Sequence, residues 1–481
     1  MGSICTNSLQ NNFADYSPRS GGNVAPINMS SLKGITNYIS KNCEAFEDVY
    51  ETEQRKLGFG FYGDVKMCVH RVTGVARAVK IMSKERFGRG TLSEDWFFKQ
   101  IEIISQIDHP CFIRVHEYFE DRDYFYLVMD YHEEGSLSAK LKSSKTCSED
   151  FIKKLMKKLL SGITYLHSLG IVHRDLKPEN ILVNEKDGEI LVKIIDFDTC
   201  TKLNESGKIS GLFGTAFYMP PEMVPGQYDS KCDLWSLGMV MYNLMTQKFP
   251  FSGMSDREII NNIQKVQINF HCPELLRFSK DCRSMLEKLL QKDPIKRISA
   301  ENALLDPWLS IPETYSKIEI TLNSLHKSKV KNIAIKEFLI KHFSTLKDFE
   351  ELDLAFIELD TDNDGVISIS DVLQFYNKGY NKAEAHQKTE DFFDRLKGLS
   401  EEFVSYEDFL NACVNLKDVL DEKRISRFLE KGTGGLTGFC VDGMTGVESW
   451  DWFLDLKRKI DDDLTPKDFR GIVLERICVK L

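Results

Sequence analysis

A glycine-rich run followed by an Ala-Val-Lys run constrains the fold of this chain more than any other feature. Gly58, Gly60 and Gly63 fall in the pattern G-x-G-x-x-G-x-V, which Val65 completes. Glycines let backbone amides approach phosphate groups closely. An ordinary glycine-rich turn would show the same pattern, so this run alone is a weak signal. Residues 78–80 read Ala-Val-Lys, and a lysine on a strand can neutralise the α- and β-phosphates of ATP.

A block of polar residues follows in the order that phosphoryl transfer requires. Residues 173–180 read His-Arg-Asp-Leu-Lys-Pro-Glu-Asn, which spaces Asp175 to accept a proton from a substrate hydroxyl. Asn180 lies five residues after Asp175 and can hold one magnesium ion. Asp196 begins an Asp-Phe-Asp run, where a second ligand for magnesium is expected.

Two further motifs, Pro-Glu at 221–222 and Asp-Leu-Trp-Ser-Leu-Gly at 233–238, follow in the chain. Because these signals occur together, in order and at the right spacing, they argue strongly against a chance match. Residues of about 50–310 therefore resemble a protein kinase catalytic domain. In that resemblance Lys177 is the form usual for serine/threonine specificity, since it can contact the transferred phosphate.

The resemblance extends to the adenine-binding segment and to the order of the whole chain. Residues 126–131, Tyr-Leu-Val-Met-Asp-Tyr, are similar to the strand and hinge that hold adenine, with Met129 as gatekeeper. The order of kinase domain, basic junction and EF-hand region resembles the calcium-dependent protein kinases of plants and apicomplexan parasites. Gly-Thr-Ala-Phe-Tyr at 214–218 is similar to the activation segment of that family. This implies an α+β chain, a bilobal protein kinase fold followed by an all-α EF-hand regulatory region.

The resemblance also implies the chemistry, that of a calcium-regulated serine/threonine protein kinase. Its cofactors would be ATP, magnesium and calcium, and its partners would be protein substrates. The expected catalytic residues are Asp175, Lys177 and Lys80, and the expected magnesium ligands are Asn180 and Asp196. The residues expected to contact ATP are Leu57, Gly58, Gly60, Gly63, Val65, Ala78, Lys80, Met129, Asp130, Tyr131 and Glu179.

Three positions depart from the kinase pattern. Asp198 replaces the glycine of D-F-G, and it would either assist the metal or point to solvent. Gln100 stands where the glutamate partner of Lys80 is expected, while Glu102 faces the other side of that helix. Ser136 replaces a glutamate used for ribose and basic substrates. A weakly active kinase, or a pseudokinase acting as a calcium-responsive interaction protein, is therefore the alternative; the complete phosphoryl-transfer core favours activity.

Residues 360–371, Asp-Thr-Asp-Asn-Asp-Gly-Val-Ile-Ser-Ile-Ser-Asp, match a calcium-binding EF-hand loop. The expected ligands are Asp360, Asp362, Asp364, Val366, Ser368 and Asp371. The apolar Ile367 can pair with a neighbouring loop. Asp371 stands where a bidentate glutamate would close the calcium shell, which predicts a weaker site or a mixed calcium and magnesium site. An Asp-rich surface turn is the plain alternative.

The other hand-like segments are degenerate. Residues 397–408 have the loop length and the apolar Val404, but they lack oxygen ligands at positions 1 and 3. Residues 457–468 carry lysine at both of those positions, and the stretch 432–438 offers no carboxylate set. We expect these segments to keep the hand fold for packing. With one good loop, calcium activation should be modest.

The chain divides into four parts on this interpretation. Residues 1–45 are expected to be disordered and 46–311 to form the kinase domain. The Lys-rich, amphipathic segment 312–345 is expected to supply autoinhibitory junction helices, although an ordinary packing helix would show the same pattern. Residues 346–481 complete the EF-hand region.

The N-terminus and the composition bear on location. Gly2 lies in an M-G-x-x-x-[ST] pattern for myristoylation, and Cys5 could supply a second acyl chain. A flexible end that begins Met-Gly would look the same. The net charge of -10 argues against a nucleic-acid partner, and the scattered cysteines show no C-x-x-C pair. We expect a cytoplasmic monomer that acylation would tether to a membrane.

Overall fold

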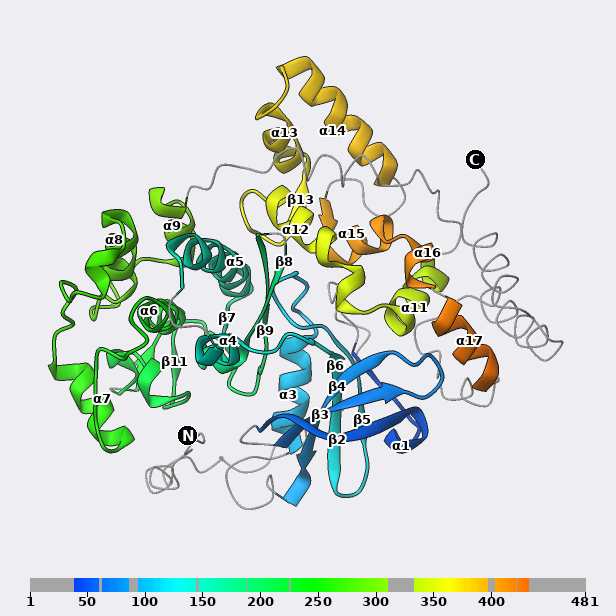
Figure 1. The fold of residues 1–481 in the computed structure, drawn as a ribbon, viewed down its shortest axis with the longest axis horizontal. Coiled ribbons are helices and arrows are strands. Elements are labelled where there is room, and N and C mark those ends of the chain that lie inside the picture. The colour runs from blue at the N-terminus through cyan, green and yellow to red at the C-terminus, as the bar shows by residue number, and fades with distance from the viewer. Residues whose placement is uncertain are drawn as a thin grey trace.

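The computed structural model describes residues 39–59, 63–85, 94–143, 147–186, 188–224, 226–309, 333–396, 403–420 and 422–431. A sheet-rich lobe, a helical lobe and a further helical region follow one another along the chain, as the colours of Figure 1 show. This confirms the expected α+β fold class, a bilobal architecture followed by helices. Among the described helices, none combines the length and the apolar character that a membrane crossing requires.

The first lobe is built on one twisted sheet with the strand order β1-β5-β6-β4-β3-β2. Its strands are β1 (Ser40–Lys41), β2 (Tyr50–Phe59), β3 (Gly63–His70), β4 (Ala76–Ser83), β5 (Val115–Glu120) and β6 (Tyr124–Asp130). Neighbouring strands are antiparallel, except that β1 runs parallel to β5.

Helices cover both faces of this sheet because successive residues of a strand face opposite sides. Phe125 of β6 stacks on Phe97 of α3 (Glu94–Ile104), with ring centroids 4.1 Å apart. The next residue, Tyr126, stacks on Phe46 of α1 (Phe46–Val49) at 4.6 Å. Aromatic pairs of this kind add stability beyond the area they bury. They fix α3 against one side of the sheet.

The second lobe is a helical assembly around two buried helices. α5 (Glu149–Ser168) begins at Ser148, whose hydroxyl accepts the Phe151 amide, and α6 (Lys231–Thr246) is apolar almost all round, as expected of a core helix. The other helices are α4 (Leu137–Ser143), α7 (Asp256–Lys265), α8 (Lys280–Leu289) and α9 (Ala300–Leu304). The 3₁₀ turns are η3 (Pro178–Asn180), η4 (Ala216–Tyr218), η5 (Pro221–Met223), η6 (Leu275–Arg277) and η7 (Pro307–Leu309).

Short strand pairs hold the segments between the lobes. The antiparallel pairs are β8 (Ile181–Lys186) with β9 (Glu189–Ile194), β7 (Ile171–Val172) with β10 (Thr201–Lys202), and β11 (Ile209–Ser210) with β12 (Gln227–Tyr228). They clamp the loop 173–180 on one side and the segment 196–222 on the other. Asp175, Asn180 and Asp196 lie on these two segments.

The C-terminal region, meaning the described parts of residues 333–431, has its own apolar core. It contains α11 (Ile333–Phe343), η8 (Leu346–Asp348), α12 (Glu350–Leu359), β13 (Val366–Ser368), α13 (Ile369–Asn377), α14 (Lys382–Leu396), β14 (Phe403–Ser405), α15 (Tyr406–Cys413), α16 (Leu416–Val419) and α17 (Glu422–Lys431). Phe356, Phe375 and Phe409 are fully buried in it. β13 pairs with β14, which sets Ile367 opposite Val404. The segment 360–371 therefore has a partner in the segment around 404.

The junction is described only from residue 333 onward. Leu339, Ile340 and Phe343 of α11 pack in the core of the C-terminal region. The Lys341 carbonyl accepts a hydrogen bond of 2.8 Å from Arg77 of the sheet lobe. This half of the junction is a packing helix in the structure. Residues 310–332 lie outside the described part, and so the autoinhibitory role of the junction stays a prediction.

A buried ion pair in the helical lobe gives a test of the fold. Arg297 is fully buried, and its guanidinium binds both oxygens of Glu222, one of them at 2.9 Å. Removing one partner of a buried pair leaves the other charge unsatisfied. We expect Arg297→Ala to lower the free energy of unfolding by about 3–5 kcal/mol, measured by chemical denaturation. The exposed neighbour change Lys296→Ala should alter it by no more than about 0.5 kcal/mol. Equal losses in both variants would contradict this.

Candidate active site and acidic loop

The strands of the sheet lobe bring four predicted ATP contacts onto one face. Ala78 and Lys80 lie two residues apart on β4, so they face the same side. Met129 of β6 lies opposite Ala78, and Val65 of β3 lies opposite Lys80. Directly opposed residues of adjacent strands share a face. The sheet therefore presents three apolar side chains and one ammonium group together.

The predicted glycines differ in how much space a side chain would have at each position. A Cβ on Gly63 would lie 2.0 Å from the Ile81 carbonyl oxygen, so close packing between β3 and β4 already demands glycine there. A Cβ on Gly58 would meet only Val65, at 3.9 Å, so that glycine is free to serve a ligand. Gly60 lies outside the described residues. Leu57 lies beside Gly58 and is partly exposed.

The side chain of Asp130 is held in place by two neighbouring side chains. Its carboxylate is buried, 3.0 Å from Arg77 and 2.7 Å from His116. Its amide donates to the Arg114 carbonyl at 3.0 Å. The Asp130 carbonyl is therefore the group through which this residue can contact adenine. Tyr131 follows directly, at the end of β6.

A buried carboxylate fixes the catalytic loop. Asp233 of α6 accepts the backbone amides of His173 and Arg174 at 3.0 and 2.9 Å, and it lies 2.9 Å from the His167 ring. Arg174 has φ 69°, a conformation that needs such support. The sequence marked Asp233 only as part of a motif. Its anchoring role emerges from the fold.

The catalytic loop gathers the predicted reactive residues around Asp175. Lys177 Nζ lies 2.7 Å from Asp175 Oδ2, and the Thr215 hydroxyl lies 3.1 Å from Oδ1. Lys177 also donates to Thr215 at 2.9 Å. Burial raises the pKa of Asp175, and the Lys177 ammonium opposes that rise. Thr215 was not predicted as a site residue, although it lies in the activation-segment motif.

The residues predicted to hold magnesium are suited to it by donor type. Asn180 donates its amide nitrogen to the Asp175 carbonyl at 2.9 Å, which leaves its side-chain oxygen for a cation. Burial favours a neutral Asp196, but Lys80 outweighs this and lowers the pKa of Asp196 to about 2. Asp196 is therefore ionised, and oxygen donors are the ligands that magnesium prefers. The two side chains fit the ion that the kinase fold implies.

Glu179 lies apart from the sheet face. Its carboxylate accepts a hydrogen bond of 3.0 Å from Ser138, and it borders a groove of about 290 Å³ that Tyr218 and Phe249 also line. All of these residues belong to the helical lobe. The role of Glu179 as an ATP contact stays a prediction.

The position of Asp198 overturns one expectation from the sequence, namely that its side chain points to solvent. It does not point to solvent, because its carboxylate is 14% exposed and lies 2.5 Å from Lys80 Nζ. The alternative, that Asp198 assists the metal, stays a prediction. Lys80 also binds Asp196 at 2.7 Å. Burial and Asp196 raise the pKa of Asp198 to about 7, against the effect of Lys80. The left-handed backbone conformation falls on Asp196, with φ 68°, and Asp198 is not in that region. Asp198 therefore occupies the position of a glycine without left-handed backbone strain.

Gln100 of α3 does not pair with Lys80. Its amide nitrogen lies 3.5 Å from the Cys200 carbonyl. Its side-chain oxygen is buried and has no hydrogen-bond partner in the described part of the chain. Glu102, on the same helix, is exposed. The helix therefore supplies Lys80 with no charge from either position.

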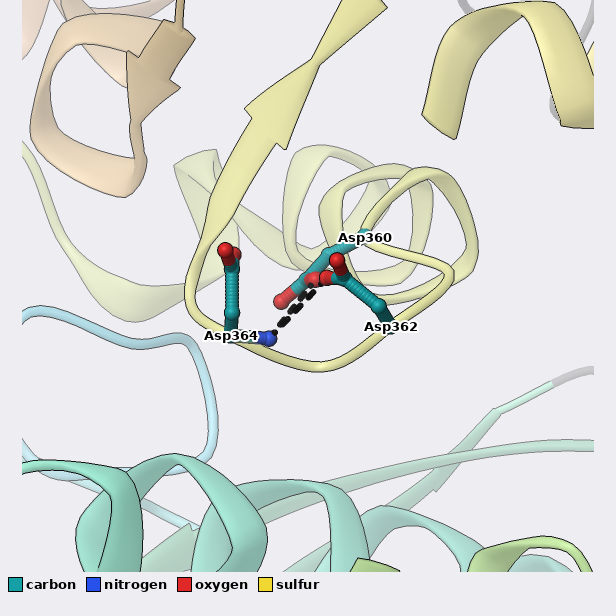
Figure 2. Close-up of side chains that lie close together, drawn as sticks. All are labelled: Asp360, Asp362 and Asp364. Carbon is teal, nitrogen blue, oxygen red and sulfur yellow. Dashed lines mark hydrogen bonds between the residues drawn. The ribbon is translucent and has the colours of Figure 1, made fainter. Parts of the chain in front are cut away.

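The acidic loop, residues 360–371, draws three carboxylates together (Figure 2). Oxygen atoms of Asp360, Asp362 and Asp364 lie within 4.8 Å of one another. Gly365 has φ 89°, which allows its amide to turn inward and donate to Asp360 at 3.0 Å. Burial raises the pKa of Asp360 to about 8, and the neighbouring acids add to that rise. A cation would remove this repulsion.

Asp371 is engaged elsewhere. One of its oxygens accepts the Ser368 amide at 2.9 Å and also the Ser368 hydroxyl, which forms a capping box at the start of α13. The other accepts the Thr361 amide at 3.2 Å. The Val366 amide donates to Asp364 at 2.9 Å. Three of the six predicted ligands therefore converge, while Ser368 and Asp371 satisfy each other.

Several predictions fall outside the described residues. These are the acylation sites Gly2 and Cys5, the segments 432–438 and 457–468, and part of 397–408.

The comparisons with known proteins agree with this geometry. The protein kinase domain family matches residues 51–309. Calcium-dependent protein kinase 4 of Plasmodium falciparum (isolate 3D7) is 29% identical, over 88% of this chain and 85% of the relative. Calcium-dependent protein kinase 5 of the same organism is 31% identical, over 84% and 72%. Calcium-dependent protein kinase 3 of Plasmodium berghei (strain Anka) is also 31% identical, over 80% and 68%. The chain therefore belongs to the calcium-dependent protein kinases, a family of serine/threonine protein kinases.

Proposed function

We propose that this chain transfers the γ-phosphate of ATP to serine or threonine hydroxyls of protein substrates, and that calcium regulates the transfer. The observation that carries the proposal is the cluster around Asp175, where Lys177, Asn180 and Thr215 all bind one carboxylate. Asp196 interacts electrostatically with Asp175, and Lys80 binds Asp196 at 2.7 Å. The reactive groups Lys80, Asp175, Asn180 and Asp196 are therefore all retained, whereas the acid of α3 is not.

Each residue has a distinct part in this chemistry. Asp175 would orient the substrate hydroxyl and accept its proton, since its oxygens already bind two hydrogen-bond donors of comparable type. Lys177 would stay beside the transferred phosphoryl group, and Lys80 would neutralise the phosphates nearer the adenosine. Magnesium, held by Asn180 and Asp196, would supply further neutralisation of the phosphate charge.

The proton acceptor gives the direct test of activity. We expect Asp175→Asn to lower phosphorylation of a generic protein substrate by about 10²–10⁴-fold, because the amide cannot accept the proton. The measurement is incorporation of radiolabelled phosphate from ATP. Binding of a fluorescent ATP analogue should be unchanged and serves as the folding control. Equal incorporation by the wild type and the variant would favour the pseudokinase alternative.

The calcium proposal is supported by the position of the acidic loop, which packs on the kinase helix α5. A Cβ on Gly365 would lie 2.2 Å from the Tyr165 ring, so the two are in close contact. The Tyr165 hydroxyl accepts the Asp108 amide at 2.8 Å and donates to the Gln106 carbonyl at 3.2 Å. Residues 106–108 lie just beyond the end of α3. A change in the loop therefore reaches the turn that supports α3.

Charged contacts extend this interface. Glu358, just before the loop, binds Lys157 and Lys158 of α5 at 3.3 and 3.1 Å. Burial opposes ionisation of Glu358, but the two lysines outweigh it and lower its pKa to about 2. Asp353 of α12 binds Lys193 of β9 at 2.8 Å, and both side chains are buried. These pairs couple the C-terminal region to the kinase lobes.

Calcium activation should be real but modest. Within the described residues, one group of acidic side chains is close enough to share an ion, and a ligand shifts an equilibrium only by its differential affinity. We expect calcium, relative to a chelator, to raise the kinase rate by less than about a hundredfold. Asp362→Ala should remove the response, whereas the exposed change Asp391→Asn on α14 should keep it. A larger stimulation, or a response that survives Asp362→Ala, would count against the proposal.

The engaged Asp371 predicts how the loop can be improved. Glutamate at this position is one methylene longer and can close a cation shell with both oxygens. We expect Asp371→Glu to raise calcium affinity about tenfold and to weaken magnesium competition. Calorimetric calcium titration of the whole protein, with and without magnesium, measures both. An unchanged or weaker affinity at an unchanged melting temperature would contradict the expectation.

We further propose that the protein is a cytoplasmic monomer and that acylation of Gly2, with Cys5 as a second site, tethers it to a membrane. The support is the N-terminal sequence pattern. One acyl chain gives only marginal binding, so the second would decide how long the tether lasts.

A further inference from the structure

Lys80 is a buried cation whose surroundings differ from the kinase pattern. Its side chain is 6% exposed, and it lies 2.7 Å from Asp196 and 2.5 Å from Asp198. A buried ammonium group needs opposing charge and hydrogen-bond partners, because desolvation is otherwise costly. The two carboxylates of the Asp-Phe-Asp run supply both.

Helix α3 supplies Lys80 with neither an opposing charge nor a hydrogen-bond partner. Gln100 is uncharged, its nitrogen is directed to Cys200, and its buried oxygen has no partner among the described residues. The acids Asp95 and Glu102 are exposed. Among the α3 side chains that the structure describes, none places a negative charge on Lys80.

Asp196 alone cannot serve as the partner throughout the reaction. Asp196 is the residue expected to bind magnesium, and a carboxylate that binds a metal ion attracts an ammonium group less strongly. Asp198 is separated from it by Phe197, which is buried and fixes the position of the run. Asp198 therefore offers Lys80 a second carboxylate partner.

We propose that Asp198 is a positioning residue that replaces the missing acid of α3, holding the Lys80 ammonium in place for the nucleotide phosphates. The inference rests on the proposed function, since Lys80 matters through ATP. It also explains how an aspartate is accommodated in place of glycine: its backbone is not left-handed, and its charge is matched by a contact of 2.5 Å. The substitutions at 100 and 198 are then one exchange, in which the acid has moved from the helix to the loop.

The exchange can be reversed in the full-length protein. Asp198→Gly should weaken binding of an ATP analogue by about tenfold or more, because one close ionic partner of a buried cation is lost. The double change Asp198→Gly with Gln100→Glu should restore affinity to within about threefold of wild type, since the acid returns to α3. Gln100→Glu alone should bring no gain, because it adds a third carboxylate around one ammonium group.

Three readouts distinguish this role from a structural one or a metal-binding one. Analogue affinity is measured with and without magnesium, the magnesium midpoint of kinase activity is determined, and thermal melting monitors folding. We expect the affinity loss and its rescue in both magnesium conditions, with an unchanged midpoint. Wild-type affinity after Asp198→Gly, failure of the double variant to recover, or a loss confined to the magnesium midpoint would overturn the proposal.

If Asp198→Gly does not fold, a second variant replaces it in the same test. Asp198→Asn keeps the size of the side chain and removes its charge, so the same loss and the same rescue by Gln100→Glu are expected from it, and a lack of either would refute the role. If the wild type phosphorylates no substrate while the affinity exchange holds, the proposed function fails and the pairing of Lys80 with Asp198 stands.

Discussion

The reactive centre depends on one buried carboxylate. Asp233 holds two consecutive backbone amides of the catalytic loop and a histidine ring, all within 3.0 Å. Those bonds stabilise the unusual backbone at Arg174, which in turn directs Asp175 toward Lys177 and Thr215. Buried amides without partners are costly, so these bonds favour the observed conformation of the loop. The chemistry is positioned by the core of the helical lobe.

The residues whose roles follow from short-range spacing could be predicted. Lys80, Asp175 and Asn180 lie in motifs whose local geometry is nearly self-determined, and the fold places them on the expected strand and loop. Contacts between distant segments could not be predicted. Asp198 meets Lys80 across 118 positions of sequence, a contact that no local pattern encodes. Asp371, which was predicted as a ligand, also forms a local capping box with Ser368, and its ligand role stays a prediction.

The C-terminal region packs against both lobes of the kinase domain. Its Glu358 contacts α5, and its Asp353 contacts β9. Its Lys341 carbonyl accepts a hydrogen bond from Arg77 of the sheet lobe. The residues that these contacts join do not include Asp175, Lys177 or Asn180. An ion in the acidic loop would therefore alter the support of the lobes and leave the reacting groups untouched, which fits a regulatory site of small energy.

The Asp198 contact also changes what α3 can control. When a lysine forms an ion pair with an acid on a helix, displacing that helix breaks the ion pair. Here the counter-charge travels with the loop that follows β9, so α3 can rotate or shift while Lys80 keeps its partner. A small molecule that displaces the Asp-Phe-Asp loop would therefore disable both the lysine and the metal site together.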